Sequence, residues 1–487
     1  MSKSSMHSLE LGRARASSRI IDKYVIVPVL ACIYTIIVAP ILSFFTAPAP
    51  MRQWSVQSYL EAMTAPHWQN KVVWPALAAM SLVVALRNRS RLTLPPYIIC
   101  LIAYLALAGA SVLWAFKPEV SLTRFVMQVI ILTSIILPAL LAVRTADMMR
   151  SVFLCFAFTA ILNFLVVLVQ DPVIWLDNNQ ELIIYQGYFD FKGTLGECAA
   201  IAFLLSIHQM LFPGLRRAFA VIVLVVTSYL MFVSKSKGAL GLAIIAPVLA
   251  QLTLFVGKKM HVSPAAVLLP LLLCYEVVSR IPGSNIINRV SYRLYANYTL
   301  SGRTVIWDFV NYEIGRRPLL GWGYQSFWLV GADSPSMVEA PGWVKSMPSA
   351  HNGYLDTMLD TGYVGFALFA IFILATLRAI GRVADREPAR AWLLLSLALF
   401  VILTNFLESG WMHGMDILWV SFAIVVAEIA RCSHPSAVSS DARSRHRYGF
   451  QLAHSSLTDT RAHSGAISRR SVPHSGAGWK APGGASS

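Results

Sequence analysis

The sequence predicts an all-α integral membrane protein with about twelve transmembrane helices. Of its 487 residues, 56% are hydrophobic and only 13% are charged, and the mean hydropathy is +0.60. An ordinary soluble domain carries about 25% charged residues, so lipid must solvate most of this chain. The apolar residues also form long continuous stretches. Such stretches favour helices, because a membrane barrel would have alternating segments of about ten residues.

The predicted spans follow one another along most of the chain. Their lengths match what a helix needs to cross a hydrocarbon core about 30 Å thick. Hydropathy places them near residues 24–45, 72–86, 96–116, 125–143, 151–169, 194–212, 218–234, 239–256, 262–280, 362–380, 390–407 and 415–430. Because the second and the last spans are short and glutamates interrupt or border others, about ten to thirteen spans are compatible with the pattern.

The spans divide the chain into five parts. A basic N-terminal segment occupies residues 1–23, and nine spans lie within 24–280. A large polar loop follows at 281–361, and three more spans lie within 362–430. Residues 431–487 are rich in Ser, Arg, His, Gly and Ala, a composition that predicts a disordered basic tail.

Positive charge predicts the orientation of the spans, because short cytoplasmic loops retain Lys and Arg. Roughly two thirds of the 40 Lys and Arg residues fall on the side of the membrane that holds both termini. We therefore expect cytoplasmic termini and an exterior position for the loop at 281–361. The net charge of +16 then reflects topology and contact with membrane lipids, and we expect no nucleic acid as a partner.

The large loop is too rich in aromatic and aliphatic residues to be disordered. Five of its apolar residues recur at helical spacing: Val305, Ile306, Phe309, Val310 and Ile314. We therefore expect short amphipathic helices that fold back onto the membrane region. A second polar segment, at 171–192, also exceeds what a connection between spans requires.

His351 stands just before a second helical pattern in the large loop. Gly362 offers a stop for this helix, and four apolar residues share one of its faces: Tyr354, Leu355, Met358 and Leu359. The positive end of a helix dipole disfavours an imidazolium, and a neutral ring can accept a proton as a general base. The alternative is a hydrogen-bonded surface histidine without a catalytic role.

Four basic residues from separate parts of the chain are predicted to gather at the exterior surface: Lys237, Arg303, Arg317 and His351. Such cations suit a diphosphate, because each charge-assisted hydrogen bond contributes roughly 1.5 to 3 kcal/mol and Arg can engage two oxygens at once. Lys235 lies beside Lys237 at the mouth of two spans. For this pair of lysines the alternative is that both reach out to lipid headgroups.

Neither metal nor nucleotide chemistry is indicated. The six cysteines lie in or next to predicted spans and lack disulfide or metal spacing. His413 and Asp416, in the last exterior loop, also lack the spacing of metal ligands. No Gly-rich nucleotide loop or hydrolase motif occurs. The sequence therefore predicts a protein without a cofactor.

Four short motifs carry a resemblance to a known family. They are Ser301-Gly302-Arg303 with Trp307, Arg317-Pro318-Leu319-Leu320-Gly321-Trp322-Gly323, Ala350-His351-Asn352, and Leu359-Asp360-Thr361-Gly362. In these motifs and in the position of the large loop, the sequence resembles the O-antigen ligase and polymerase superfamily. Within it, the chain is most similar to exopolysaccharide polymerisation proteins.

The resemblance implies a glycosyltransferase-C-like helical fold in the bacterial inner membrane, with the large loop in the periplasm. It implies transfer of a glycan from a polyprenyl diphosphate carrier to an acceptor hydroxyl, without metal or nucleotide. The partners would be the polyprenyl diphosphate-linked oligosaccharide and membrane lipids, together with chain-length regulator and export proteins. The absence of an evident carboxylate pair in the loops adds the expectation of direct displacement with inversion.

The resemblance also assigns roles to residues. His351 would activate the acceptor hydroxyl and Arg303 would hold the diphosphate. Lys237 stands where many members have arginine, so a point charge replaces a bidentate fork. Further contacts to the diphosphate would come from Arg317 and Lys235. Three residues of the matched motifs would support the site: Asn352, Gly321 and Gly323.

Three alternatives remain open at the level of sequence. An O-antigen ligase would use the same chemistry with a lipid-core acceptor. A lipid-linked oligosaccharide transporter would also have many spans with few charges, although transporters usually carry polar groups near the membrane midplane. A non-catalytic partner in a polysaccharide export assembly is the third.

Overall fold

The computed structural model describes residues 22–46, 68–89, 92–141, 147–177, 180–279, 292 and 302–433. The predicted N-terminal segment up to residue 21, the first part of the large loop and the tail from residue 434 onward lie outside the described residues. All elements below belong to the unit Met1–His434.

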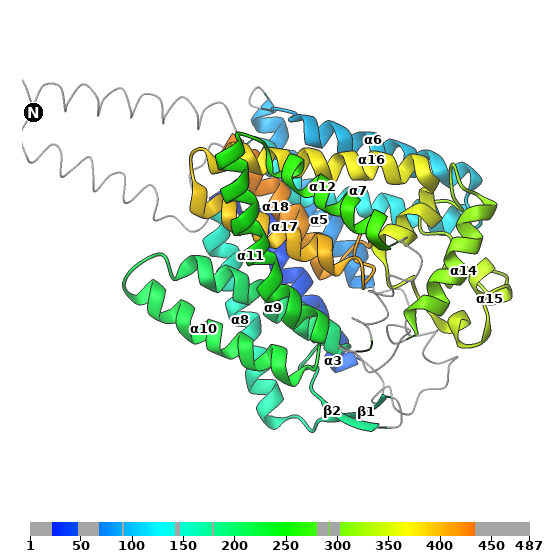
Figure 1. The fold of residues 1–487 in the computed structure, drawn as a ribbon, viewed down its shortest axis with the longest axis horizontal. Coiled ribbons are helices and arrows are strands. Elements are labelled where there is room, and N and C mark those ends of the chain that lie inside the picture. Colours follow the sequence, from blue (N-terminus) through cyan, green and yellow to red (C-terminus); the bar gives the residue numbers. More distant parts are fainter. Residues whose placement is uncertain are drawn as a thin grey trace, which may run out of the picture. The chain divides into compact units, whose positions relative to one another are not determined.

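Before the large loop, the described parts of the chain are almost entirely helical (Figure 1). The elements are α2 (Ile26–Ile33), η1 (Tyr34–Val38), α3 (Ala39–Thr46), α5 (Trp68–Arg87), α6 (Pro96–Ala110), η4 (Ser111–Trp114), α7 (Pro118–Leu140), α8 (Met148–Val169), α9 (Lys192–Gln209), α10 (Leu215–Val233), α11 (Lys237–Met260) and α12 (Pro264–Ser279). Between α8 and α9, in the polar segment at 171–192, β1 (Val173–Asp177) and β2 (Gln180–Ile184) form a small antiparallel hairpin.

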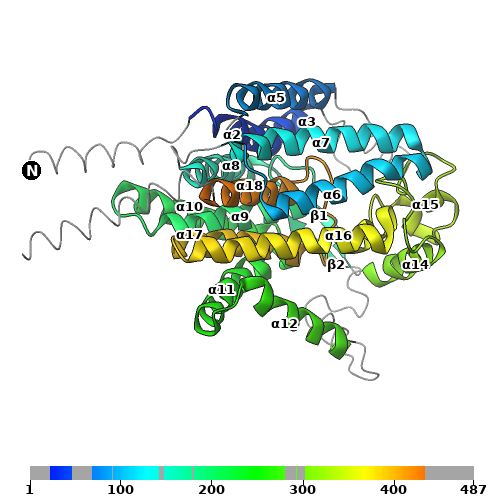
Figure 2. The ribbon, with the colours of Figure 1, turned by 90° about the horizontal axis from the view of Figure 1, so that it is seen from above.

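The second half contains two groups of helices. In the large loop lie α14 (Arg303–Arg316), α15 (Pro335–Val338) and η5 (Gly342–Ser346). They are followed by α16 (Gly353–Ala384), α17 (Pro388–Thr404) and α18 (Ile417–Ser433). Helices α6 and α16 run side by side, with α14 and α15 at one end of the pair (Figure 2).

The prediction of an all-α integral membrane protein is confirmed. Eight helical segments of the described chain are long and apolar enough to cross a membrane, and each coincides with a predicted span: Ile26–Phe45, Trp68–Arg87, Pro96–Trp114, Pro118–Leu140, Met148–Val169, Leu215–Val233, Lys237–Met260 and Gly353–Ala384. The other four predicted spans coincide with α9, α12, α17 and α18, which are shorter or, for α9, less apolar. The number twelve therefore stays a prediction.

Helices α9, α17 and α18 lie at the centre of the membrane region. Almost every residue of α18 is buried, and the helix contacts α7, α16 and α17. In contrast, α5 and α10 expose valine and leucine side chains such as Leu82, Val83 and Val225. Exposed apolar side chains suit lipid, whereas a central helix surrounded by protein can be shorter and can carry polar groups.

The described part of the large loop, residues 302–361, folds against the helix ends, as predicted. Within α14 the predicted apolar face is buried except for Val305, which is 40% exposed. The loop is bound to the start of α7: Lys117 N donates to Ser326 Oγ at 2.7 Å, and Ser121 Oγ donates to the Tyr324 carbonyl at 2.7 Å. We call the side of the membrane region that carries residues 302–361 the loop face, and the other side the opposite face.

Helix α16 is broken at Gly362, where the sequence predicted a stop, but it continues beyond the break. Gly362 has a φ of 66° and a ψ of −171°. Two amides freed by the break donate to the large loop, from Tyr363 to the Pro318 carbonyl at 2.7 Å and from Val364 to the Leu319 carbonyl at 3.3 Å. The loop thus satisfies backbone groups that a broken membrane helix would otherwise leave unpaired.

The Gly362→Ala variant is expected to be destabilised by about 2–5 kcal/mol, because alanine combines backbone strain with a clash. A Cβ at this position would lie 2.2 Å from the Leu319 carbonyl carbon. The matched control is Gly315→Ala in α14, where a Cβ meets nothing within 4 Å and alanine should stabilise the helix by about 1 kcal/mol. Thermal unfolding in detergent measures both; equal stability of the two variants would contradict the role of Gly362.

A network of ion pairs joins helix ends on the opposite face. Asp147, which precedes α8, accepts from Arg216 Nη2 at 3.2 Å and from Arg390 Nη2 at 3.3 Å. Glu428 pairs with Arg390 and, at 2.8 Å, with Arg431 Nη1. The side chains of Glu428 and Arg431 are fully buried. The network therefore connects α8, α10, α17 and α18 through charges that depend on one another.

Candidate active site

Glu408 joins the two residues that the sequence singled out as catalytic. Its Oε1 lies 2.7 Å from Nη2 of Arg303, the first residue of α14. Its Oε2 lies 3.2 Å from Nδ1 of His351. Three separate segments meet here: the start of α14, the start of α16 and the loop between α17 and α18. The His351 and Glu408 side chains are 32% and 37% exposed, so solvent or a substrate can reach the pair from the loop face.

The charge of Glu408 defines the tautomer of His351. Burial raises the pKa of Glu408, but the hydrogen bond with His351 and the charge of Arg303 outweigh it and hold the pKa below its ordinary value. Glu408 is therefore ionised at neutral pH and can only accept hydrogen bonds. A neutral His351 must then donate from Nδ1, which leaves the lone pair on Nε2.

Backbone contacts hold His351 in position at the start of α16. Its φ is 47°, a left-handed conformation that is uncommon for histidine. The next residue, Asn352, is the N-cap of α16, and its Oδ1 accepts from the amides of Tyr354 at 3.1 Å and Leu355 at 3.2 Å. Asn352 therefore caps α16 directly after His351, and its supporting role in the site stays a prediction.

The backbone at Lys237 lies near the segment that directly precedes Glu408. Lys237 is the first residue of α11, and a Cβ on the next residue, Gly238, would lie 4.0 Å from Cδ1 of Leu407. Leu407 directly precedes Glu408, so the start of α11 abuts the segment that carries the carboxylate. Lys235 is exposed, with its Nζ 4.4 Å above the Phe232 ring.

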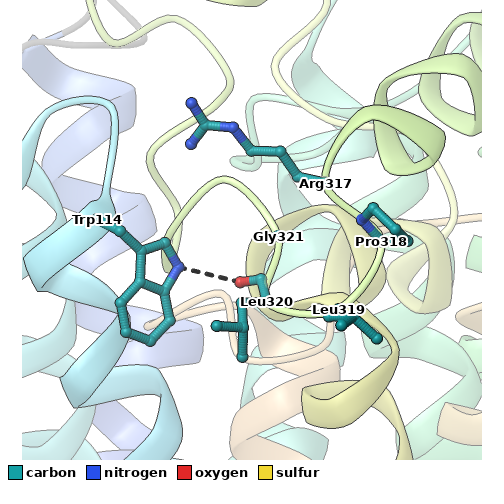
Figure 3. Close-up of a pocket in the computed structure, with 6 residues that line it drawn as sticks. All are labelled: Trp114, Arg317, Pro318, Leu319, Leu320 and Gly321. Carbon is teal, nitrogen blue, oxygen red and sulfur yellow. Dashed lines mark hydrogen bonds between the residues drawn. The ribbon is translucent and has the colours of Figure 1, made fainter.

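Arg317 is not brought to this cluster. It follows the last residue of α14, and the 14 residues of that helix place it about 21 Å from Arg303. Its guanidinium lies 4.0 Å above the Trp322 ring. Arg317 lines a shallow pocket together with Trp114 and residues 318–321, in which Trp114 Nε1 donates to the Leu320 carbonyl at 3.1 Å (Figure 3).

Gly321 and Gly323 have an architectural role. Both have a positive φ, 65° and 96°. A Cβ on Gly321 would lie 2.5 Å from the carbonyl carbon of Asp360, and one on Gly323 would lie 2.4 Å from Cα of Ala115. Only glycine lets the loop pass this close to α16 and to the end of η4.

Glu408 was missed by the analysis of the sequence. It follows a predicted span and lies in a short exterior loop without Lys or Arg. One signal could have identified Glu408. It is a carboxylate on the exterior surface, where the basic residues were expected to gather. Within the ranges that the structure describes, no group of three or more His, Cys, Asp or Glu residues could hold a metal ion. The expectation of a protein without a cofactor stays a prediction.

Apolar helices of membrane-spanning length and a charged cluster at their ends define a multi-pass membrane protein with a candidate site on the loop face. Residues 220–370 match the family model described as O-antigen ligase, and this match supports the resemblance to the O-antigen ligase and polymerase superfamily. Comparison with the curated proteins gave no match. The matched segment contains all eight predicted site residues, whereas Glu408 lies beyond its end.

Proposed function

We propose that the protein is an exopolysaccharide repeat-unit polymerase. It transfers a glycan from a polyprenyl diphosphate carrier to an acceptor sugar hydroxyl at the periplasmic face of the inner membrane. The observation that supports this function best is the contact of one carboxylate, Glu408, with both Arg303 and His351. A base for an acceptor hydroxyl and a cation for a diphosphate thereby lie side by side.

The proposed reaction is a direct displacement. Nε2 of His351 takes the proton of the acceptor hydroxyl while the acceptor oxygen bonds to the anomeric carbon, and the bond from that carbon to the carrier diphosphate breaks. The diphosphate leaves with the electron pair, and Arg303 stabilises its charge with Lys237 as a second cation. Attack opposite the leaving group inverts the anomeric carbon. This chemistry uses no metal or nucleotide.

Glu408 acts through both of these residues. It holds the imidazole of His351 with Nε2 available, and its negative charge stabilises the imidazolium that forms when the proton arrives. It also holds the Arg303 guanidinium beside the base. Its two oxygens contact Nη2 of Arg303 and Nδ1 of His351, so the carboxylate fixes the distance between these two nitrogens. This arrangement keeps the base and the cation in one geometry before the substrate binds.

The distribution of charges favours a transferase over a transporter. Ion pairs of the described ranges, such as Arg303–Glu408 and Arg431–Glu428, lie in loops or near helix ends. A translocation pathway usually places polar or charged groups near the membrane midplane. The ligase alternative has the same chemistry as the polymerase and differs only in the acceptor.

The His351→Asn variant tests the proposed function. Loss of the base is expected to lower transfer by about 10²- to 10⁴-fold. His261→Asn is the matched control, because His261 lies at the far end of α11 and has a φ of 55°, close to the 47° of His351, and asparagine tolerates this left-handed conformation. In a deletion strain complemented with His351→Asn, carrier-linked single repeat units should accumulate, and His261→Asn should restore polymer.

The carrier-linked glycans distinguish the rival functions. A ligase defect leaves full-length polymer on the carrier, and a transporter defect leaves repeat units on the cytoplasmic side of the membrane. Normal polymer in the His351→Asn strain, with the variant present in the membrane, overturns the proposal.

A further inference from the structure

Asp356 is a buried carboxylate in the first turn of α16 that the proposed reaction does not use. It is 3% exposed. Trp328 Nε1 donates to its Oδ1 at 2.9 Å, the Ala350 amide donates to Oδ1 at 3.1 Å and to Oδ2 at 3.2 Å, and the Ser409 hydroxyl donates to Oδ2. Among the described residues, no Lys or Arg forms an ion pair with it. A buried carboxylate held by hydrogen bonds alone is costly, so its presence requires a reason.

Two partners of Asp356, Ala350 and Ser409, are chain neighbours of His351 and Glu408. Ala350 directly precedes His351, and Ser409 directly follows Glu408. One carboxylate therefore holds the segment that carries the base and the segment that carries its acidic partner. The two segments are far apart in the chain, since 57 positions separate His351 from Glu408.

A second set of contacts closes the same connection. Ser409 Oγ, which donates to Asp356, accepts from the Asn352 amide at 3.0 Å. The Gly353 amide donates to the carbonyl of Glu408 at 3.0 Å. His351 thus lies between two anchored residues, and these contacts maintain its left-handed backbone against the strain of φ 47°.

We infer that Asp356 is a positioning residue, which sets the His351–Glu408 geometry for glycan transfer by anchoring Ala350 and Ser409 together. This inference rests on the proposed function. Positioning has a specific kinetic consequence, because a misplacement of about 1 Å at a reacting group can lower a rate by about 100-fold without changing the binding of remote parts of the substrate. A carboxylate that only stabilised α16 through the helix dipole would not separate kcat from KM.

The test compares Asp356→Asn with Asp360→Asn in the purified full chain reconstituted in liposomes, with a carrier-linked oligosaccharide as substrate. Asp360 is the matched control, because it is a buried carboxylate one turn further along α16 without a hydrogen bond to Ala350 or Ser409. We expect Asp356→Asn to lower kcat by about 10- to 100-fold with KM for the carrier substrate changed less than about 2-fold. Asp360→Asn should retain kcat in its folded fraction.

Ser409→Ala provides a second variant that keeps the buried carboxylate and two of its donors. It should also lower kcat. Adding it to Asp356→Asn should cause little further loss of kcat, because both changes break the same connection between the Ala350 and Ser409 segments. Thermal unfolding of each variant identifies a defect in folding.

The outcomes separate this inference from the proposed function. An unchanged kcat for Asp356→Asn, or equal losses of kcat for Asp356→Asn and Asp360→Asn, overturns the positioning role while His351→Asn remains inactive. Transfer by His351→Asn at the wild-type rate instead overturns the proposed function, whatever the result for Asp356.

Discussion

The Glu408→Gln variant is expected to transfer glycan about 10²- to 10⁴-fold more slowly than the wild type, the largest effect that a substitution outside the matched segment should have. An amide has a single acceptor oxygen, and with that oxygen facing Arg303 its NH2 group donates to Nδ1 of His351, so the ring places its proton on Nε2, where the base must be free. The same change removes the ion-pair partner that lies 2.7 Å from Arg303. Single-turnover transfer in proteoliposomes measures the loss.

Glu339→Gln is the matched control for this prediction. Glu339 also pairs with an arginine of α14, Arg316, but both side chains of that pair are exposed at the far end of the helix from Arg303. An exposed ion pair contributes about 0–1 kcal/mol, so transfer by Glu339→Gln should stay within about 3-fold of the wild type. If Glu408→Gln were as active as this control while His351→Asn was inactive, Glu408 would have a structural role only and no role in transfer.

The pKa of Glu408 determines where pH should affect the pair. Its folded pKa lies below the ordinary value of 4.5, so the carboxylate is charged above that value, and its contribution is lost only as the pH falls through the lower folded pKa. Acidification from pH 7 to about 5 should therefore leave the Glu408–Arg303 ion pair intact. A loss of transfer within this range must come from another group. Binding of the carrier substrate, measured over the same pH range, should then show no such loss.

Most of the fold could be predicted from the sequence because lipid imposes a simple rule on it. A long apolar stretch in a membrane must be a helix, and all eight segments of membrane-spanning length lie where hydropathy placed a span. The rule is weaker for α9 and α18, which are surrounded by other helices. Such helices need neither a full span of apolar residues nor a continuous apolar surface, so their lengths and polar residues do not follow hydropathy.

The site was predictable only in part. His351 and Arg303 were recognised from residue type and motif, and the structure brings them to one carboxylate. Arg317 was grouped with them because it lies in the same loop, but α14 is a rigid helix that separates the two arginines by about 21 Å. Glu408 could not be paired with His351 from the sequence, because nothing local identifies a contact across 57 positions.

The first turns of α16 explain another miss. An apolar face was predicted from Tyr354, Leu355, Met358 and Leu359, yet Asp356 and Asp360 are more buried than most of these residues. A pattern of apolar residues identifies the core-facing side of a helix only where the core is apolar. Where the interior is a network of hydrogen bonds, as around Asp356, the inward side is polar, and such conflicts between local pattern and fold are expected at functional sites.

The second large effect is expected on stability, at the opposite face. The Glu428→Gln variant should lower the free energy of unfolding by about 3–5 kcal/mol, because it leaves the buried guanidinium groups of Arg390 and Arg431 without their shared carboxylate. Denaturant unfolding in detergent micelles measures the change. The matched control is Glu387→Gln, since Glu387 also pairs with Arg390 but its side chain is 36% exposed, and its loss should cost about 1 kcal/mol or less.

Transfer activity should separate this effect from the effects at the active site. Glu428 lies 11 residues beyond the first residue of α18, or about 17 Å along the helix from the loop that carries Glu408. The folded fraction of Glu428→Gln should therefore transfer glycan at the wild-type rate. If Glu428→Gln lost kcat without losing stability, the opposite face would take part in the reaction. If Glu428→Gln were as stable as Glu387→Gln, the buried charges would not depend on Glu428.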